Sequence, residues 1–416
     1  MKRLQLLVVL GGVVFASVLL ITGLARVFAQ EASGPVILDM DTNVFKVGEF
    51  TDAKKEKRPA GAVELVDGKL GKALRFTFAE GAKNAFISTR LSPTAEWDAS
   101  DGFSFWVKGD GSANFGGLEL IHPDDYNLRY GYCFPLDSTD WRKIIVPWRK
   151  MTPEHPAGKL VDAKTGMKPS QFAQLWFGKW FYWRQYPAVS YAIDQLALEK
   201  KIDLDRTDYT PKTGGTPRLL AKLKARQPVT IVTMGDSLSD KRHWANRQTL
   251  WSELLVKKLK ETYGGEVTLV NQGIGGNHLS HNLVLMPTWL RTTPKPDLVT
   301  VWFGYNDWTD GMRGEAYKER LRFAVDLIRR ETKGAAEVML MTTCPAYERW
   351  DEMTELADAA RAAREEKNAA LADVAAVFHK LDRNAARKEG YWCRDNVHLG
   401  AKGHDVTSDT VLKAIE

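Results

Sequence analysis

The pattern of apolar positions changes once along the chain. Between about residues 35 and 200, short runs rich in aromatic and β-branched residues alternate with Gly, Pro, Asp and Asn. Examples are ALRFTFAE, GFSFWVKGDG, RKIIVPW and YAIDQLALEK. Many short strands separated by turn residues are typical of a β-sandwich or jelly roll. We therefore expect residues 30–202 to form an all-β jelly-roll sandwich.

The second half has a different periodicity. The near-continuous apolar runs VTIVTM, EVTLV, DLVTVWF and EVMLMTT alternate with stretches of helical spacing such as TLWSELLVKKLKETY. Strands that are apolar on both faces and alternate with helices predict a parallel sheet covered on both sides. Residues 218–416 are therefore expected to form an α/β/α doubly wound domain. The polar stretch 203–217, which contains Pro and Gly, is expected to be a linker.

The first 29 residues belong to neither pattern. Lys2 and Arg3 precede an uncharged, apolar stretch from Leu4 to Ala25, and small residues follow at the spacing of a cleavage site. This arrangement predicts a signal peptide over residues 1–29 and an extracytoplasmic protein, secreted or periplasmic. The apolar stretch is also long enough to span a bilayer, so an uncleaved membrane anchor is the alternative. A membrane is an expected partner only in that case.

Composition and charge exclude few classes of protein. The chain has 416 residues, of which 44% are hydrophobic and 26% charged, as in ordinary globular proteins. Subtracting the three basic residues of the leader from the net charge of +6 leaves +3, which gives no ground for a nucleic-acid partner. Three cysteines are too few for a disulfide scaffold. Cys344 and Cys393 could pair after export, and the sequence leaves that pairing open.

Four polar segments follow the predicted strands of the second half or precede its last helix. They are GDSLS at 235–239, NQGIGGNH at 271–278, GYNDW at 304–308 and DNVHLGAKGH at 395–404. Functional loops of a doubly wound sheet gather at the carboxyl ends of its strands. Ser237 can act as a nucleophile if His398 takes its proton, and Asp395 can orient the imidazole. A tetrahedral intermediate also needs hydrogen-bond donors, and the candidates are the Ser237 and Gly276 amides and the Asn306 side chain.

These segments resemble, in the same order, the four blocks of the SGNH or GDSL hydrolase superfamily. The resemblance covers roughly residues 228–416 and implies a flavodoxin-like α/β/α fold. It implies that Ser237, His398 and Asp395 form a catalytic triad and that Ser237, Gly276 and Asn306 form the oxyanion hole. Gly273 and Gly275 also offer amides, but Gly276 lies five residues after Asn271, where the pattern places its glycine. The resemblance implies no metal and no other cofactor for catalysis.

The first half resembles the galactose-binding-like, jelly-roll carbohydrate-binding modules. GFSFWVKGDG, WRKIIVPW and YAIDQLALEK carry this resemblance, and no binding residue transfers with it. Within the aromatic run 176–183, Trp176, Trp180 and Trp183 could stack on sugar rings, although such strands are also typical of a core. By the resemblance, structural calcium is common in such modules. Its conceivable ligands here are Asp39, Asp41 and Asp194.

Three further side chains of the second half have open roles. Trp308 follows the third segment and could line an acyl or leaving-group pocket, or belong to the core. His278 and His281 lie three residues apart but have no matching third ligand, so no metal site is expected there.

Together these features predict an exported serine esterase that removes acetyl or other short acyl groups from carbohydrates. Its expected partner is an acylated carbohydrate. A lipid esterase, lysophospholipase or thioesterase of the same superfamily is the alternative. The alternative of another class is a carbohydrate-binding protein with an inactive hydrolase half.

Overall fold

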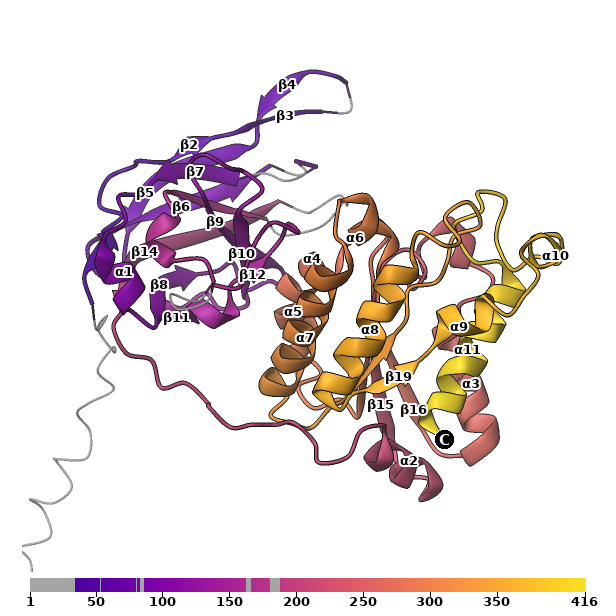
Figure 1. Ribbon diagram of the computed structural model, residues 1–416. Helices are drawn as coiled ribbons and strands as arrows, with labels where there is room; N and C mark the ends of the chain where they lie inside the picture. Colours follow the sequence, from indigo (N-terminus) through magenta and orange to yellow (C-terminus); the bar gives the residue numbers. More distant parts are fainter. Residues whose placement is uncertain (1–33, 53, 80, 83–85, 162–165, 180–187) are drawn as a thin grey trace, which may run out of the picture.

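A computed structural model of the chain describes residues 34–52, 54–79, 81–82, 86–161, 166–179 and 188–416 (Figure 1). The expected leader 1–29 and two of the tryptophans singled out from the sequence, Trp180 and Trp183, lie outside the described residues. The described chain forms an N-terminal half rich in β-strands and a C-terminal half in which strands alternate with helices.

The N-terminal half is built from two antiparallel sheets. One has the order β11-β8-β14-β6-β5, with β1 paired to β14, and the other has the order β12-β10-β9-β13-β7-β2. Strands β3 (Glu49–Thr51) and β4 (Lys57–Pro59) form a separate hairpin. The strands of the two sheets are β1 (Val36–Leu38), β2 (Lys46–Val47), β5 (Gly61–Asp67), β6 (Lys72–Phe78), β7 (Phe86–Arg90), β8 (Gly102–Lys108), β9 (Phe115–Ile121), β10 (Arg129–Pro135), β11 (Arg142–Pro147), β12 (Thr152–Pro153), β13 (Gln174–Lys179) and β14 (Val189–Glu199).

Aromatic side chains from both sheets meet in one core, so the two sheets form a sandwich. The ring of Phe177 on β13 lies 5.8 Å from that of Phe76 and 5.7 Å from that of Phe105, measured between centroids. Because side chains alternate along a strand, Trp176 points to the opposite face of the sheet from Phe177. The predicted all-β fold of this half is confirmed.

The C-terminal half contains a five-stranded parallel sheet in the order β16-β15-β17-β18-β19. This is the flavodoxin-like order, in which the second strand lies at one edge and the first lies inside. The strands are β15 (Val229–Gly235), β16 (Val267–Gly273), β17 (Leu298–Trp302), β18 (Glu337–Met341) and β19 (Ala370–Ala372). The helices are α2 (Pro217–Lys224), α3 (Trp251–Tyr263), α4 (Leu279–Val284), α5 (Met286–Leu290), α6 (Tyr305–Thr309), α7 (Gly314–Glu331), α8 (Thr354–Lys367), α9 (Val374–Phe378), α10 (Arg383–Lys388) and α11 (Ala401–Ile415).

Helices cover both faces of this sheet, which explains its apolar strands. Every residue of β17 and β18 is buried. Along β15, Val232 packs in the cluster that includes α4, α7 and α8, whereas Ile231 packs in the one that includes α2, α3 and α11. The predicted α/β/α arrangement is thus confirmed. Among the described residues, no helix has the length and apolarity needed to cross a membrane.

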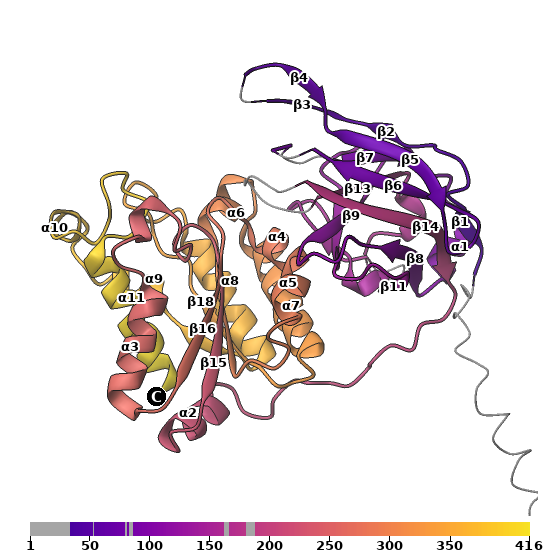
Figure 2. The ribbon, with the colours of Figure 1, turned by 180° about the vertical axis from the view of Figure 1, so that it is seen from behind.

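The segment between the two halves follows the surface. Residues 201–216 form no helix or strand, and α2 begins at Pro217, the last residue of the expected linker. Figures 1 and 2 show the segment running along the outside of the molecule from the sandwich to α2. The Asp205 carbonyl accepts a hydrogen bond from Arg149 at 2.8 Å, and the Pro211 carbonyl accepts one from Asn368 at 3.3 Å.

The sandwich packs directly against the C-terminal half. The outer face of its second sheet contacts α4 and α5 through β10 and β12 (Figures 1 and 2). Phe115 and Cys133 from the sandwich form an apolar cluster with Val284 and Leu285. The two halves are therefore joined by a packed interface as well as by the linker.

A buried arginine holds the interface together. Arg320 on α7 donates to the carbonyls of Pro153 and Gly158 in the sandwich and to Ser280 Oγ on α4. Only 5% of its surface is exposed, and burial lowers its pKa to about 10, which leaves it charged at neutral pH. Hydrogen bonds to these three acceptors replace the hydration that the guanidinium group loses on burial.

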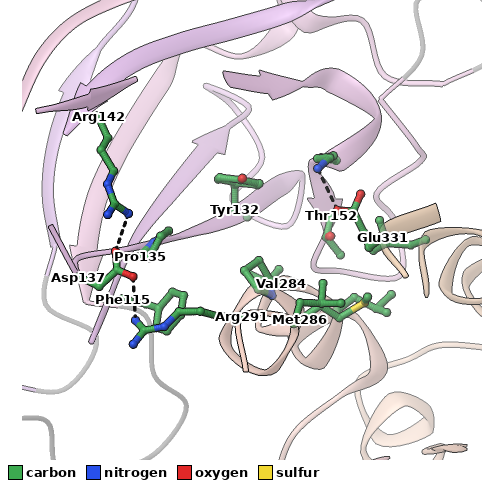
Figure 3. A pocket seen from close by; sticks show the side chains of 16 residues that line it. Phe115, Tyr132, Pro135, Asp137, Arg142, Thr152, Val284, Met286, Arg291 and Glu331 are labelled. Atoms are coloured by element: carbon green, nitrogen blue, oxygen red, sulfur yellow. Dashed lines mark hydrogen bonds and ion pairs between the residues drawn. The ribbon is translucent and has the colours of Figure 1, made fainter. Parts of the chain in front are cut away.

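Ion pairs and a cavity complete the interface (Figure 3). Lys150 Nζ lies 2.9 Å from Glu331 Oε2. The Asp137 carboxylate lies between two guanidinium groups, 2.9 Å from Arg142 and 3.3 Å from Arg291. These residues line a cavity of about 410 Å³ whose other walls are mainly apolar side chains of β9, β10, α4 and α5.

Replacing Arg320 should weaken the fold. We expect Arg320→Ala to lower the free energy of unfolding by about 2–4 kcal/mol, because two buried carbonyls and a hydroxyl lose their donor. Urea denaturation would measure the change. Arg322→Ala on the same helix is the matched control. Arg322 pairs with Glu366 at a site where both side chains are about 40% exposed, so its loss should cost less than about 1 kcal/mol. Equal effects of the two substitutions would contradict the role given to Arg320.

Candidate active site

The parallel sheet brings three of the four polar segments together. Strand β15 pairs with β16 on one side and with β17 on the other, so the segments that follow these strands meet at one edge. Ser237 follows β15, Gly276 follows β16 and Asn306 follows β17. The edge between β15 and β17 is also where the strand order reverses, the usual position of a binding site in this topology.

A tight turn presents Ser237 at this edge. Asp236 closes it: its carboxylate accepts the amide of Leu238 at 2.9 Å, and its carbonyl accepts the amides of Ser239 and Asp240 at 3.1 Å. A Cβ atom at Gly235 would lie 2.4 Å from Ser239 Oγ, so a larger residue does not fit there. The Gly-Asp-Ser sequence therefore ends the strand abruptly and leaves the serine pointing toward the fourth segment.

Ser237, His398 and Asp395 form a hydrogen-bonded line. Ser237 Oγ lies 2.8 Å from His398 Nε2, and His398 Nδ1 lies 2.5 Å from Asp395 Oδ2. When Asp395 accepts a hydrogen bond from the Nδ1–H group of the neutral imidazole, Nε2 is left to accept the serine proton. The geometry thus matches that of a nucleophile, a base and an orienting carboxylate.

Backbone hydrogen bonds fix the position of the Asp395 carboxylate. Its Oδ1 accepts the amides of His398 at 3.1 Å and Val397 at 3.2 Å. Burial alone would raise the pKa of Asp395, but hydrogen bonds from the His398 ring and from both amides outweigh it and keep the pKa below its ordinary value. Asp395 is therefore ionised at neutral pH, and its negative charge can stabilise a protonated His398.

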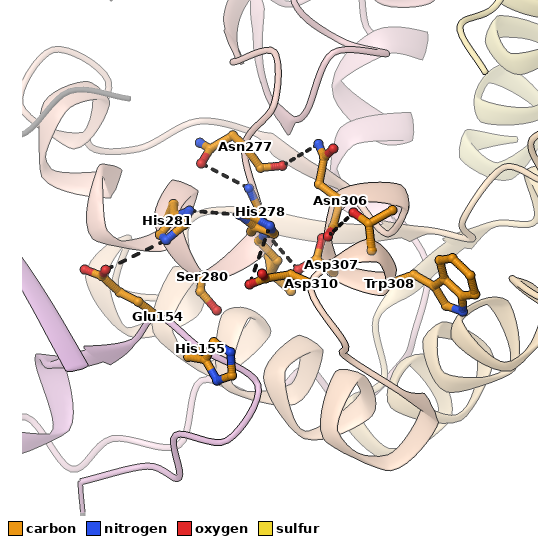
Figure 4. A network of polar contacts seen from close by, with 12 residues as sticks. Glu154, His155, Asn277, His278, Ser280, His281, Asn306, Asp307, Trp308 and Asp310 are labelled. Atoms are coloured by element: carbon orange, nitrogen blue, oxygen red, sulfur yellow. Dashed lines mark hydrogen bonds and ion pairs between the residues drawn. The ribbon is translucent and has the colours of Figure 1, made fainter. Parts of the chain in front are cut away.

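The expected oxyanion donors follow the strands on either side of β15, which carries the serine at its end. Asn306 Nδ2 donates to the Asn277 carbonyl at 2.9 Å, and a primary amide has a second N–H for a substrate (Figure 4). The amides of Gly273 and Gly275 are engaged by Asn271 and Asp240, at 2.8 and 2.9 Å. Gly276 has a φ of 75°, which favours glycine, and it stays the predicted backbone donor of this loop.

Two aromatic residues next to His398 were not identified from the sequence. The His243 ring stacks on the His398 ring, with centroids 4.1 Å apart, and Trp244 meets His398 edge-on at 5.9 Å. Burial, followed by the charge of His398, lowers the pKa of His243, so this neighbour stays neutral near pH 7. Trp244 is 44% exposed at the rim of the site. His243 precedes the short 3-10 helix Trp244–Asn246, which follows the first polar segment, and no periodic pattern in the sequence marks either residue.

Two carboxyl groups beside the site are buried. Asp236 precedes the serine and Asp307 follows Asn306, and both are almost fully buried. Burial raises the pKa of Asp236 to about 7 and also raises that of Asp307. Asp307 Oδ1 accepts the Leu279 amide at 3.1 Å, which ties the third segment to the start of α4. Both aspartates therefore hold the loops behind the site.

The remaining tryptophans singled out from the sequence have different surroundings. Trp308 packs against the core of the C-terminal half, and its ring is flanked by the guanidinium groups of Arg313 at 4.6 Å and Arg349 at 5.3 Å. Trp176 lies half-buried on the outer face of the sandwich, with its ring 4.3 Å from Phe86 and 5.6 Å from Tyr126. Tyr126 is exposed, so this group is an aromatic patch at the surface.

The aspartates considered for calcium close backbone turns. Asp194 Oδ2 accepts the amides of Lys69 and Leu70 at 2.6 and 2.7 Å, and Asp41 Oδ1 accepts the Lys72 amide at 2.7 Å. Asp39 accepts the Asp41 amide at 3.0 Å. Within the described ranges, no group of three or more His, Cys, Asp or Glu side chains could hold a metal ion.

The cysteines and His404 are held by packing. Cys133, Cys344 and Cys393 are all free thiols, so the pairing of Cys344 with Cys393 that the sequence left open does not occur in this structure. His404 is buried, and its Nδ1 accepts the Trp251 amide at 3.3 Å.

Comparisons with known proteins agree with both halves of the fold. Residues 233–406 match the model of the GDSL-like lipase/acylhydrolase family, and residues 38–166 match that of the family 11 carbohydrate-binding domain. None of the curated proteins matches the chain.

Similar solved structures cover 45% of this chain. They include an acetyl xylan esterase variant from Geobacillus stearothermophilus (22% identity, 94% of that chain, TM-score 0.36). A lipase/acylhydrolase from Enterococcus faecalis (18%, 95%, 0.38) and a psychrotrophic esterase from Pseudoalteromonas sp. (22%, 96%, 0.36) are similar to the same extent.

The family match spans all four polar segments, and the hydrogen-bonded serine, histidine and aspartate lie within it. The C-terminal half of the chain is therefore an ester-bond hydrolase domain that matches the GDSL-like lipase/acylhydrolase family over residues 233–406, and it follows a sandwich that matches the family 11 carbohydrate-binding domain.

Proposed function

We propose that the protein is an exported serine esterase that removes acetyl or other short acyl groups from carbohydrates. The observation that carries the proposal is the hydrogen-bonded line from Asp395 through His398 to Ser237, which ends at the carboxyl edge of the sheet. The leader-like residues 1–29 support export, which the N-terminus of the mature protein would test.

The reaction follows from the positions of these groups. Ser237 Oγ attacks the ester carbonyl carbon while His398 Nε2 takes the serine proton, and Asp395 stabilises the resulting imidazolium. The amides of Ser237 and Gly276 and Asn306 Nδ2 donate to the developing oxyanion. The tetrahedral intermediate collapses, and the sugar hydroxyl leaves with the proton from His398. Water, activated by the same histidine, then cleaves the acyl-serine and releases the acid.

The carbohydrate assignment rests on two features of the chain. The sandwich matches a carbohydrate-binding domain, and it exposes an aromatic patch of Trp176, Phe86 and Tyr126. Trp244 offers a further exposed ring 5.9 Å from the ring of His398. Aromatic faces of this kind suit the apolar faces of sugar rings. A lipid esterase or thioesterase shares the catalytic residues and differs only in what these surfaces bind.

Substitution of the catalytic residues should remove turnover and leave the fold intact. We expect Ser237→Ala to abolish most hydrolysis of p-nitrophenyl acetate, because members of a triad act as a unit. Asn306→Ala should lower kcat by about 10²–10³-fold if it donates to the oxyanion. Asn384→Ala, a surface asparagine bonded to Tyr347, is the control and should keep wild-type kcat. A folded Ser237→Ala protein with near wild-type activity would show that the assignment is wrong.

The length of the acyl chain separates the proposal from its alternative. We expect a higher kcat/KM for p-nitrophenyl acetate than for the octanoate. The Arg394 guanidinium lies 5.6 Å from the indole centroid of Trp244, the ring next to His398, and a charged group there disfavours a long apolar chain. Kinetics over a series of ester lengths would measure the preference. A clear preference for long chains would favour a lipid esterase.

The aromatic patch of the sandwich should matter for polymers alone. Trp176→Ala should lower the rate of acetate release from an acetylated polysaccharide and leave the hydrolysis of p-nitrophenyl acetate unchanged. A bound polymer raises the effective concentration of ester groups, whereas a small ester gains nothing from the aromatic patch. Leu65→Ala, an exposed apolar residue on the other sheet, is the control. Equal rates of Trp176→Ala and Leu65→Ala on the polymer would rule out this role of the patch.

A further inference from the structure

A line of buried polar side chains runs from the sandwich into the C-terminal half (Figure 4). Glu154 follows β12, and its Oε2 accepts Arg129 Nε at 3.1 Å and lies 3.8 Å from His281 Nε2 on α4. The side chains of Glu154 and His281 are only 3% and 2% exposed. A carboxyl group of one half therefore faces an imidazole of the other away from water.

A second histidine continues the line. His278 Nδ1 and His281 Nδ1 lie 3.0 Å apart, so one ring must donate and the other accept. The outer Nε2 atoms face carboxyl groups, that of His281 toward Glu154 and that of His278 toward Asp310, each at 3.8 Å. Burial lowers the pKa of His281 well below its ordinary value, which favours the neutral ring. A neutral ring that donates from Nδ1 carries no proton on Nε2. Each carboxyl group thus limits the tautomers that the pair can adopt.

The charge on Glu154 depends on its neighbours in the sandwich. Burial raises the pKa of Glu119 to about 7, and burial together with Glu119 raises that of Glu154 well above its ordinary value. Burial therefore favours the protonated form of Glu154. The hydrogen bond from Arg129 to Glu154 opposes this shift of the pKa without outweighing it.

The loop with the oxyanion donors begins where this line ends. The His278 amide donates to Asn277 Oδ1 at 3.0 Å. The Asn277 carbonyl accepts Asn306 Nδ2 at 2.9 Å, and Asn277 directly follows Gly276. A shift of His278 would therefore displace the carbonyl that orients Asn306 and the peptide unit next to Gly276.

The sandwich side of the line has a fixed position. Arg320 donates to the carbonyls of Pro153 and Gly158 on either side of Glu154 and to Ser280 Oγ between the two histidines. The segment that carries Glu154 and the helix that carries His281 are thus bonded to the same guanidinium group. Glu154 cannot move relative to α4 unless these hydrogen bonds break.

We propose that Glu154 and His281 are positioning residues of the esterase site: the carboxyl group of Glu154 orients the His281–His278 pair, which holds the Asn277 carbonyl and through it Asn306 Nδ2. The inference rests on the proposed function, because it concerns the oxyanion donors of that site. It makes the sandwich part of the catalytic unit, in addition to any binding of carbohydrate.

The test compares substitutions in the full-length protein with p-nitrophenyl acetate as substrate. His281→Leu removes both ring nitrogens and should lower kcat about 10-fold, since small displacements of donors reduce rates steeply. Glu154→Gln keeps the volume and should lower kcat about threefold by the same mechanism. KM should stay within about twofold in both, because no substrate contact is lost. Glu331→Gln, which breaks the Lys150 ion pair across the same interface, is the matched control and should keep wild-type kcat.

A double-mutant cycle with Asn306→Ala separates positioning from general damage. If His281 acts through Asn306, His281→Leu should cost less than about twofold in the Asn306→Ala background, whereas independent effects would multiply. Near-UV circular dichroism would check the fold, and Glu154→Gln supplies the same cycle if His281→Leu does not fold. Multiplicative losses, or single variants with wild-type kcat, would overturn the inference. An active Ser237→Ala protein would instead overturn the proposed function, so the two failures are distinguishable.

Discussion

The hydrogen bond between Ser237 Oγ and His398 Nε2 joins residues 161 positions apart, and the proposed chemistry of the protein depends on it. One end is fixed by the turn after β15, the strand that lies between β16 and β17. The other end is fixed by the segment before α11, where the Cys393 amide donates to the His398 carbonyl at 2.7 Å. Helix α11 packs on α3, and Lys258 of α3 pairs with Asp405 at 2.7 Å and with Asp409 at 2.5 Å. The sheet and this helix pair thus hold the two ends at hydrogen-bond distance.

The interface between the two halves buries charge as well as apolar surface. Arg320, Glu154 and Arg129 are largely removed from water, and an incorrectly placed partner would leave a buried charge without compensation. Such an interface tolerates few alternative arrangements. A fixed arrangement of the two halves is required if the sandwich positions the catalytic loops of the C-terminal half. A sandwich that served only as a flexible tether would not require a fixed arrangement.

The second sheet of the sandwich has two surfaces with different neighbours. Phe115 and Cys133, on β9 and β10, pack against Val284 and Leu285. Trp176 on β13 contacts Phe86 and the exposed Tyr126 instead. Among the described residues of this sheet, those around β13 and β7 therefore present aromatic rings at the surface. A polymer bound there would lie on the same molecule as the esterase site without displacing the interface.

The sequence by itself determined the two fold classes and the four polar segments of the site. Alternating apolar residues specify strands with one buried face, and continuous apolar runs such as β17 specify strands buried on both faces, so local pattern carries this information. Gly235, Asp236 and Ser237 are residue types that favour turns, so the sequence also predicts the turn that ends the first parallel strand. These features depend on neighbours in the chain, which a sequence displays directly.

Only the tertiary structure decided which residues surround the site. His243 stacks on His398, Trp308 packs between two arginines, and Glu154 faces His281 across the interface, yet none of these contacts has a period or a fixed spacing. Each joins elements whose relative placement follows from packing of the whole molecule. The structure likewise decided that the Gly273 amide donates to Asn271 and that the Gly275 amide donates to Asp240. Long-range contacts between single side chains leave no local pattern, and for that reason they emerge only from the folded chain.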